Sequence, residues 1–217
     1  MGFDIQYILR NLPLLLEGLR LTLIVSALGL LLAAPIGLAA ALMRLRRGAA
    51  GRVVAAYVEA FRNTPLLIQL YVVYFGLPLI GLAGDPTVSG IVSLGLYHGA
   101  FLTEVFRAGL QAVSARQLEA ASALGMRHRL AMRRIILPQA LRLMLPALGN
   151  EFVLLVKNSS LLSTIAIVDL TMAGKLMAEQ SGAVYEVFFA VGLMYLAVTT
   201  TAALLLRRAE WRLQIAE

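Results

Sequence analysis

Two ionisable residues, Glu151 and Lys157, interrupt an otherwise apolar stretch of the chain. Charged groups are costly to bury in apolar surroundings, which makes them functional candidates. Glu151 and Asn158 are seven residues apart and share one face of a helix, whereas Lys157 lies about 120° from Glu151 around the helix. Ser159 and Ser160 follow and add hydroxyl groups. This group either lines a path for a polar solute or holds the fold together by pairing with other charges.

A second informative segment is polar and reads SARQLEAASALGMRHRLAMRRIILP. Ser114 and Gln117 form a capping-box pattern, which predicts the start of a helix. Gly125 predicts the end of that helix. A second short basic helix is then expected to run to Leu137, before Pro138. The segment is therefore predicted to be two short helices joined at a glycine, as in an element that docks onto a partner.

The composition indicates the setting in which these residues act. Of the 217 residues, 60% are hydrophobic, 14% are charged and none is cysteine. These values exclude an ordinary cytosolic globule, a disordered tail and a disulfide scaffold. A polytopic membrane protein remains, with residues 1–217 forming a single transmembrane domain. The net charge of +7 then reflects basic loops rather than binding to nucleic acid.

Apolar runs of about 20 residues are long enough to span a membrane as helices. The expected spans are 21–43, 63–84, 86–103, 143–167 and 187–206. The fourth is the weakest, because two charges interrupt it. The second contains Gln69, which could line a cavity, although 62–65 could instead shape the start of a helix. The predicted fold is therefore all-α, with about five transmembrane helices.

Basic residues are concentrated in alternate connections between these spans. The segments 44–62, 104–142 and 207–212 hold fifteen of the nineteen Lys and Arg residues. If five helices alternate, all three segments lie on one side of the membrane. The positive-inside rule then predicts that the N-terminus is outside and the C-terminus is in the cytoplasm.

The first span carries a row of small residues at four-residue spacing, which would let another helix approach closely. They are Gly29, Ala33, Gly37 and Ala41. Packing within the chain is the favoured interpretation, and a contact between subunits is the alternative.

The polar segment resembles the EAA signature of bacterial ABC-importer permeases in both residue types and spacing. The matching positions are Glu119, Ala120, Ala121, Gly125, Ile135, Leu137 and Pro138. The rest of the chain resembles one branch of these permeases, the polar amino acid uptake type that includes histidine, glutamine and glutamate importers. Its supporting stretches are 59–67 with Gln69, 104–107, 137–140, 145–146 and 157–161. Two departures are Arg116, where the family commonly has glycine, and Asn158, where it often has aspartate.

This resemblance implies the type I ABC importer permease fold, in the bacterial cytoplasmic (inner) membrane. Two permease subunits would form the pathway, two ATPase subunits would bind the cytoplasmic face, and a periplasmic binding protein would deliver an amino acid. Transport would proceed by alternating access, coupled through the loop at about 111–138. The sequence contains no Gly-x4-Gly-Lys-Ser/Thr loop, so ATP and Mg would be held by the partner ATPase and not by this chain, which is expected to be neither an enzyme nor a cofactor protein.

The chemistry of the loop suits such coupling. Small alanines leave a low-relief face, and Glu119 can accept charge-assisted hydrogen bonds from a partner. The alternative for Glu119 is compensation of its own helix dipole. Four loop arginines could pair with acidic groups of the ATPase or with lipid phosphates, namely Arg127, Arg129, Arg133 and Arg134.

An amino acid presents an ammonium group and a carboxylate, and a lining of acid, amide and hydroxyl groups suits both. The residues predicted to line its pathway are Gln69, Glu151, Lys157, Asn158, Ser159 and Ser160. Asn158 weakens the case for a site dedicated to cationic amino acids, whereas Glu151 favours one. Two alternatives remain open: a permease of the same superfamily for another small solute, and a membrane scaffold that recruits a soluble partner.

Overall fold

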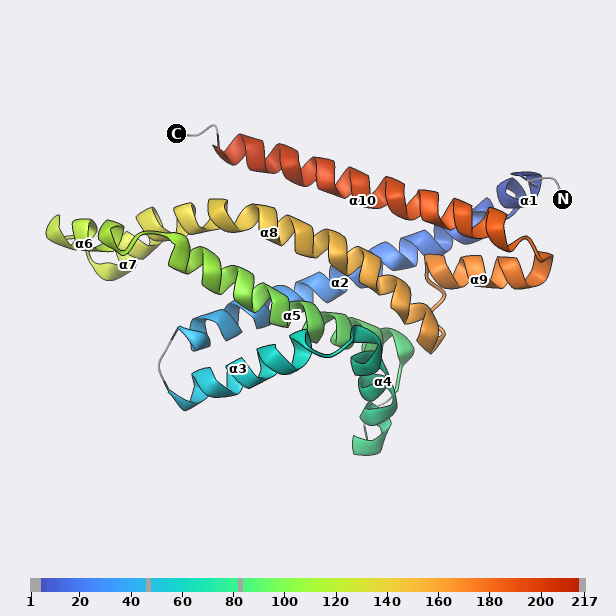
Figure 1. The fold of residues 1–217 in the computed structure, drawn as a ribbon, viewed down its shortest axis with the longest axis horizontal. Helices are drawn as coiled ribbons and strands as arrows, with labels where there is room; N and C mark the ends of the chain where they lie inside the picture. Colours follow the sequence, from blue (N-terminus) through green and yellow to red (C-terminus); the bar gives the residue numbers. More distant parts are fainter. Residues whose placement is uncertain (1–4, 46–47, 82–83, 215–217) are drawn as a thin grey trace.

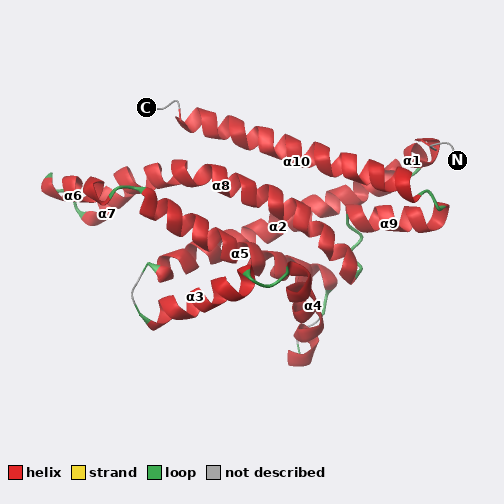
Figure 2. Ribbon diagram, in the orientation of Figure 1, coloured by secondary structure: helices red, strands yellow, loops and turns green. Residues whose placement is uncertain are grey.

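The computed structural model describes residues 5–45, 48–81 and 84–214, and these ranges contain helices and loops but no strand. Figures 1 and 2 show long helices lying side by side, with a shorter arm, α4, projecting from one flank. The helices are α1 (Ile5–Arg10), α2 (Leu12–Arg44), α3 (Ala49–Arg62), α4 (Leu66–Gly76), η1 (Leu77–Ile80), α5 (Pro86–Ala112), α6 (Ala115–Ala123), α7 (His128–Ala131), η2 (Met132–Ile136), α8 (Leu137–Asn158), η3 (Ser159–Ile165), α9 (Leu170–Ser181) and α10 (Val184–Gln214). Arg46 and Arg47, which contribute to the predicted orientation, lie outside the described residues.

Four helical segments within the described ranges are long and apolar enough to cross a membrane, and the number is five if a pair of helices bent at a short break counts as one span. The four are Leu12–Arg44, Pro86–Ala112, His128–Ile165 and Val184–Trp211. The predicted all-α fold with about five spans is confirmed. Each of these four segments is longer than its predicted apolar run, because the helices continue beyond the apolar residues.

The span expected at 63–84 is wrong in its bounds. The helical path begins at Ala49 in α3 and bends by 109° before α4. Pro65 causes the break, because a proline disfavours helical geometry in the residue before it and lacks a backbone donor. The last carbonyls of α3 are instead satisfied by side chains: Asn63 donates to Glu59 O at 2.9 Å and Thr64 to Ala60 O at 2.8 Å.

Helices α2 and α5 run in the same direction at very close range. An added Cβ on Gly37 would lie 2.7 Å from Leu102 Cβ, and one on Gly99 would lie 2.9 Å from Ile36 Cγ2. Gly29 likewise faces Leu94. The small residues predicted in the first span therefore serve packing within the chain, as favoured from the sequence.

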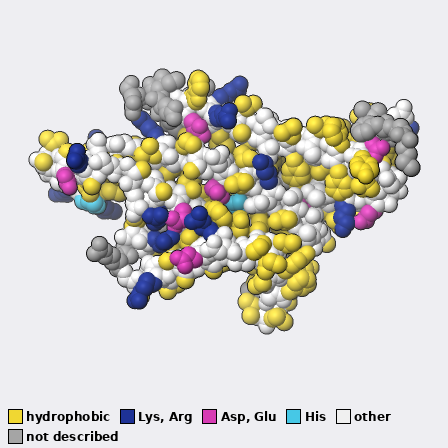
Figure 3. Space-filling view, in the orientation of Figure 1, with side chains coloured by type: hydrophobic (Ala, Val, Ile, Leu, Met, Phe, Trp, Pro, Cys, Tyr) yellow, Lys and Arg dark blue, Asp and Glu magenta, His cyan; other side chains and the backbone are white. Residues whose placement is uncertain are grey.

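The arm formed by α4 and η1 exposes a large apolar surface. Hydrophobic side chains gather over this arm in Figure 3, and they include Ile68, Val72, Phe75, Leu79 and Ile80. Helix α10 is similarly uncovered, with only 6% of its most apolar window buried inside the chain. Both surfaces are suited to contact with lipid or with another membrane subunit.

Candidate functional site

A buried histidine connects α5 to the polar face of α8. His98 is 1% exposed, and its Nδ1 lies 3.1 Å from Glu151 Oε2. Its Nε2 lies 3.2 Å from Asn158 Nδ2. The shared face predicted for Glu151 and Asn158 is therefore confirmed, because one imidazole contacts both side chains.

The orientation of these groups defines the charge of the cluster. With the Asn158 amide nitrogen donating to Nε2, the ring proton sits on Nδ1 and is donated to the Glu151 carboxylate. The imidazole is neutral in this arrangement, so the cluster keeps the negative charge of Glu151. It thus offers carboxylate and amide oxygens to a cationic or hydrogen-bond-donating group within the spans.

Aromatic rings extend this cluster along α5. The ring of Tyr97 lies 5.2 Å from that of His98 in an edge contact and 4.9 Å from that of Phe101. The guanidinium of Arg62, at the end of α3, lies 5.2 Å from the centre of the Phe101 ring. One continuous line of side chains therefore connects the bend between α3 and α4 to the buried polar cluster.

The remaining residues predicted to line a pathway have partners in their own backbone or are exposed. Ser159 is buried and donates to Val156 O at 2.8 Å, and Ser160 donates to Lys157 O at 2.7 Å. Lys157 is exposed and forms no ion pair with any described residue. Gln69 is 9% exposed and donates to Phe61 O and Thr64 O, at 2.9 and 3.0 Å, which stabilises the bend before α4.

His98 was not identified from the sequence. It lies in a helix rich in glycine and serine, within the predicted span 86–103, far in sequence from the charged fourth span. The signal that could have found it is simple: an ionisable residue near the middle of a predicted span is a functional candidate by itself.

A second charged cluster ties α2 to α5. Glu104 accepts from Arg107 Nη2 at 2.6 Å and Nε at 3.1 Å, and Arg44 also pairs with it. Arg107 donates further to Gln111 Oε1 at 2.6 Å. Arg107 donates twice to one oxygen of Glu104, Arg44 pairs with the other, and the partial burial of all three side chains makes this a stronger link than an exposed ion pair.

The predicted two-helix loop is present, but its ends differ from the prediction. Ser114 makes no side-chain capping bond, so the predicted capping box is wrong. The glycine stop is confirmed: Gly125 has φ +75°, and Met126 N donates to Ala121 O at 3.0 Å, as in a Schellman motif. At the far end, the π-helical turn η2 gives Leu137 N a bond to Met132 O, five residues back. The helix therefore continues through Pro138 into α8 rather than ending there, because the wider turn tolerates the missing proline donor.

The outer face of α6 is exposed in the part of the chain that the structure describes. Glu119, Ala120 and Gly125 are exposed, whereas Ala121 is 2% exposed and packs inward. Leu124 is 81% exposed, although it is a large apolar residue next to the glycine turn. Beyond the turn, Ile135 is partly buried, and Leu137 and Pro138 are exposed. The loop thus combines a fixed backbone with an uncovered face.

The described residues contain no group of three or more His, Cys, Asp or Glu that could hold a metal ion. Within the described residues, the candidate sites offer acid, amide, imidazole and guanidinium groups, together with the exposed surface of the loop.

Comparison with known proteins gives a family for this architecture. Residues 33–214 match the family model described as the binding-protein-dependent transport system inner membrane component. The nopaline transport system permease protein NocM of Agrobacterium fabrum is 38% identical over 222 residues, covering 96% of this chain and 91% of that protein. The glutamine transport system permease protein GlnP of Escherichia coli is 35% identical over 218 residues, covering 99% and 100%.

A solved structure agrees with this assignment. A chain of an amino acid ABC transporter with histidines is 36% identical and superposes with a TM-score of 0.91, covering 98% of this chain and 100% of that one. The resemblance drawn from the EAA positions is thus confirmed over nearly the whole length of the chain. The chain belongs to the family of binding-protein-dependent transport system inner membrane components.

Proposed function

We propose that this chain is the permease subunit of an ATP-driven importer that moves a polar amino acid from the periplasm to the cytoplasm. The observation that carries the substrate class is the cluster of His98, Glu151 and Asn158 within the spans. Ionisable and polar side chains inside membrane spans commonly mark the path of a polar solute. The names of the related permeases support amino acids as the substrate class, and their different ligands leave the individual amino acid open.

In this proposal the ammonium group of the substrate approaches the Glu151 carboxylate, and the Asn158 amide accepts or donates a hydrogen bond. His98 keeps both side chains in position. Lys157 at the end of α8 and Ser160 in η3 line the next part of the pathway. Ser159 and Gln69 support it through hydrogen bonds to backbone carbonyls. The negative charge of the cluster favours a substrate that carries at least one ammonium group.

The loop at about 111–138 would transmit the motion of the ATPase subunits. Glu119, Ala120, Ala121 and Gly125 would dock into a cleft of the ATPase, with Leu124 adding an apolar contact. The second half, with Ile135, Leu137 and Pro138, continues directly into α8, so a displacement of the loop acts on the helix that carries Glu151. ATP and Mg would be bound by the ATPase, and alternating access would follow from the switch between two arrangements of the membrane helices.

The assembly would place two permease chains, of one kind or of two similar kinds, in the bacterial cytoplasmic membrane with the N-terminus outside and the C-terminus inside. A periplasmic amino-acid-binding protein would dock on the outer face. Gentle purification of the tagged chain from its native membrane is expected to recover one ATPase subunit per permease chain. Recovery without any ATPase, at matched expression and in mild detergent, would instead favour the scaffold alternative.

Two substitutions test the coupling role of the loop. Glu119→Lys reverses the charge offered to the ATPase, and Gly125→Val forces a β-branched residue into a backbone conformation with φ +75°. Both are expected to abolish substrate-dependent ATP hydrolysis and uptake in proteoliposomes while leaving membrane insertion intact. Arg116→Gln, on the exposed part of the same helix, is the matched control. Normal uptake by both loop variants would contradict the coupling role.

A further inference from the structure

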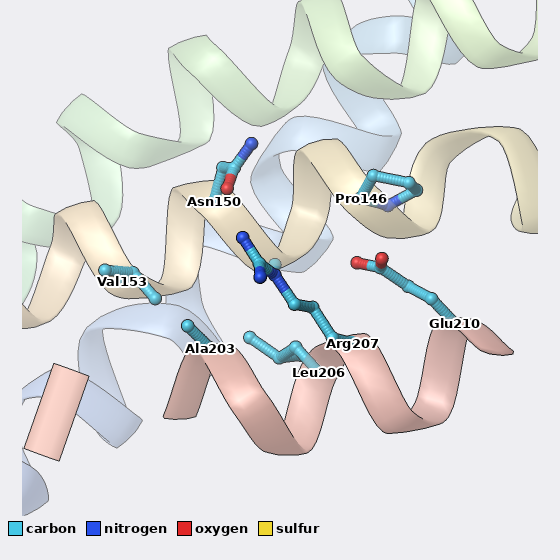
Figure 4. Close-up of a pocket in the computed structure, with 8 residues that line it drawn as sticks. Pro146, Asn150, Val153, Ala203, Leu206, Arg207 and Glu210 are labelled. Atoms are coloured by element: carbon cyan, nitrogen blue, oxygen red, sulfur yellow. The ribbon is translucent and has the colours of Figure 1, made fainter. Parts of the chain in front are cut away.

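Polar side chains outside the sites described above differ in how far water can reach them. Figure 4 shows Asn150 and Arg207 at a pocket between α8 and α10, and both residues are exposed, so water can solvate them. Asp169, between η3 and α9, is 0% exposed. It is the N-cap of α9, and its Oδ1 accepts a hydrogen bond from Met172 N at 2.8 Å. Its Oδ2 is buried as well and has no hydrogen-bond partner within the described ranges.

A second aspartate caps α5 and provides a comparison. Asp85 accepts from Val88 N at 2.9 Å, as Asp169 does from Met172 N, but Asp85 is exposed. An N-cap carboxylate in water keeps its charge at little cost, whereas a buried carboxylate without a compensating group is strongly disfavoured in its charged form. The cap geometry is thus the same at both helices, and burial is what distinguishes Asp169.

The backbone at Asp169 lies directly against α2. A Cβ added to Gly18 would lie 2.8 Å from Asp169 O, so the two backbones are in close contact. Thr22 is buried, and its Oγ1 accepts from Leu170 N at 3.0 Å and donates to Gly18 O at 3.0 Å. The carboxyl therefore lies at the point where the first turn of α9 is attached to α2.

The ionisable groups around this junction leave the Asp169 carboxyl uncompensated. On the elements packed around it they include Glu17 and Arg20 of α2, Lys157 of α8, Lys175 and Glu179 of α9, and Tyr195 of α10. The two residues of α2 pair with each other at 3.3 Å and the two of α9 at 4.0 Å, and all four are exposed. Lys157 is exposed and forms no ion pair with a described residue. The Tyr195 hydroxyl interacts with Asp169 electrostatically and lies 3.0 Å from Thr171 Oγ1, but a phenol carries no positive charge. The described residues therefore supply no cation to an ionised Asp169.

The affinity of this carboxyl for a proton follows from its surroundings. Asp169 lies outside the spans, in the connection after the fourth one, and burial raises its pKa from a usual value of about 4 to about 7, although bonds from backbone amides of α9 oppose the shift. The attached state of α9 thus holds the proton more tightly than a detached state in which the aspartate has its usual pKa. By linkage, attachment is strongest at low pH, weakens as the pH rises from about 4 to about 7, and changes little above that.

We propose that Asp169 is a proton-binding site that controls how firmly α9 is attached to α2. With a proton on Oδ2 the carboxyl is neutral, and the junction stays closely packed. Loss of the proton leaves an uncompensated charge against α2, so the first turn of α9 loosens and admits water. The junction is joined through η3 to α8, the helix that carries Glu151, so the proton acts on the outer end of that helix. This inference goes beyond the proposed function and does not depend on it.

The attachment of α9 is tested by the accessibility of a cysteine on its inner face. Ala178→Cys introduces a thiol into the buried cluster that joins α9 to α10, and Glu179→Cys places the control on the exposed side of the same helix. The purified full chain, which has no cysteine of its own, is treated with a methanethiosulfonate reagent. The rate of labelling at the inner position, divided by that at the control position, is expected to rise at least about tenfold between about pH 5 and about pH 7. Asp169→Asn keeps an N-cap oxygen but cannot ionise, so it should abolish that rise.

Thermal unfolding provides a measurement that needs no cysteine. Relative to Asp169→Asn, the midpoint of the wild-type protein is expected to fall between about pH 5 and about pH 7, whereas Asp85→Asn at the exposed cap should follow the wild type. Asp169→Ser also keeps an N-cap oxygen and repeats the comparison if Asp169→Asn fails to assemble. A labelling ratio that is the same at both pH values in the chain with Asp169 would overturn the proposal. An equal rise in the Asp169→Asn background would also overturn it, because the proton would then be bound by another group.

Discussion

At the scale of single residues, His98 contacts two polar side chains of α8 at once. Its ring fixes the positions of Glu151 and Asn158, and it does so while leaving the carboxylate charged. A partly buried carboxylate next to an imidazole is a strong acceptor for an ammonium group, because the surroundings screen the charge less than bulk water does. On the proposed function, we expect the cluster to favour substrates with an ammonium group through this charge.

Glu151→Gln tests this selectivity. The amide keeps the size of the side chain but removes its charge, so one charge-assisted contact worth about 1.5–3 kcal/mol is lost. The apparent KM for uptake of an amino acid in proteoliposomes is expected to rise roughly tenfold or more. Glu179→Gln, in the exposed part of α9, serves as the control. An unchanged concentration dependence of uptake would remove Glu151 from the pathway.

Gly37 illustrates how little space separates α2 from α5. In Gly37→Ala the new Cβ would lie 2.7 Å from Leu102 Cβ and 3.1 Å from the backbone oxygen of Gly99, and neither neighbour can turn away. The free energy of unfolding is expected to fall by about 1–3 kcal/mol. Thermal unfolding in detergent measures the change. Gly192→Ala is the comparison, since nothing lies within 4 Å of its added Cβ, and it is expected to be neutral or slightly stabilising.

At the scale of elements, hydropathy predicted the existence of the spans better than their ends. Apolar runs locate the membrane-embedded part of a helix, but α5 and α8 continue as polar helices beyond it, and no apolar signal marks that extension. The break at Pro65 was visible in the sequence, whereas the 109° bend depends on how Gln69 satisfies the backbone of α3. The passage of a helix through Pro138 required a π-turn, which sequence patterns do not reveal.

For the residues predicted to line the pathway, some features could likewise be predicted from the sequence and others could not. The shared face of Glu151 and Asn158 followed from helical periodicity alone, because both residues lie on one helix. Their contact with His98 joins two helices that are distant in sequence, so it depends on tertiary packing. Helical periodicity was therefore sufficient to predict the shared face of Glu151 and Asn158. It could not predict the contact of these two residues with His98.

Gln69→Ala is expected to weaken the bend between α3 and α4. The Gln69 amide donates to two backbone carbonyls, Phe61 O and Thr64 O, which lose their partner in the variant. Leaving two partly buried carbonyls without this partner is expected to cost about 1 kcal/mol, so the thermal midpoint of the purified protein should decrease. Gln117→Ala on exposed α6 should leave it unchanged. Equal midpoints for both variants would show that the bend is held by other contacts.

At the scale of the whole molecule, the basic segments predict one orientation in the membrane. The chain has no cysteine, so a single introduced cysteine is a unique label. With the N-terminus outside, a membrane-impermeant maleimide added to intact spheroplasts should modify Glu179→Cys on α9. It should modify Ser122→Cys on α6 only after the membrane is opened. The reverse pattern would invert the proposed topology.

The close approach of α2 and α5 also has a mechanical consequence. Glycines from each helix admit the side chains of the other, so sliding one helix along the other would create steric overlap, and separating them would open cavities. The ion pair between Arg44 of α2 and Glu104 of α5 fastens the same two helices together at one end. We therefore expect α2 and α5 to move together as one rigid unit. Any rocking of the membrane helices would then be absorbed elsewhere, at the sharp bend before α4 and along the loosely attached α10.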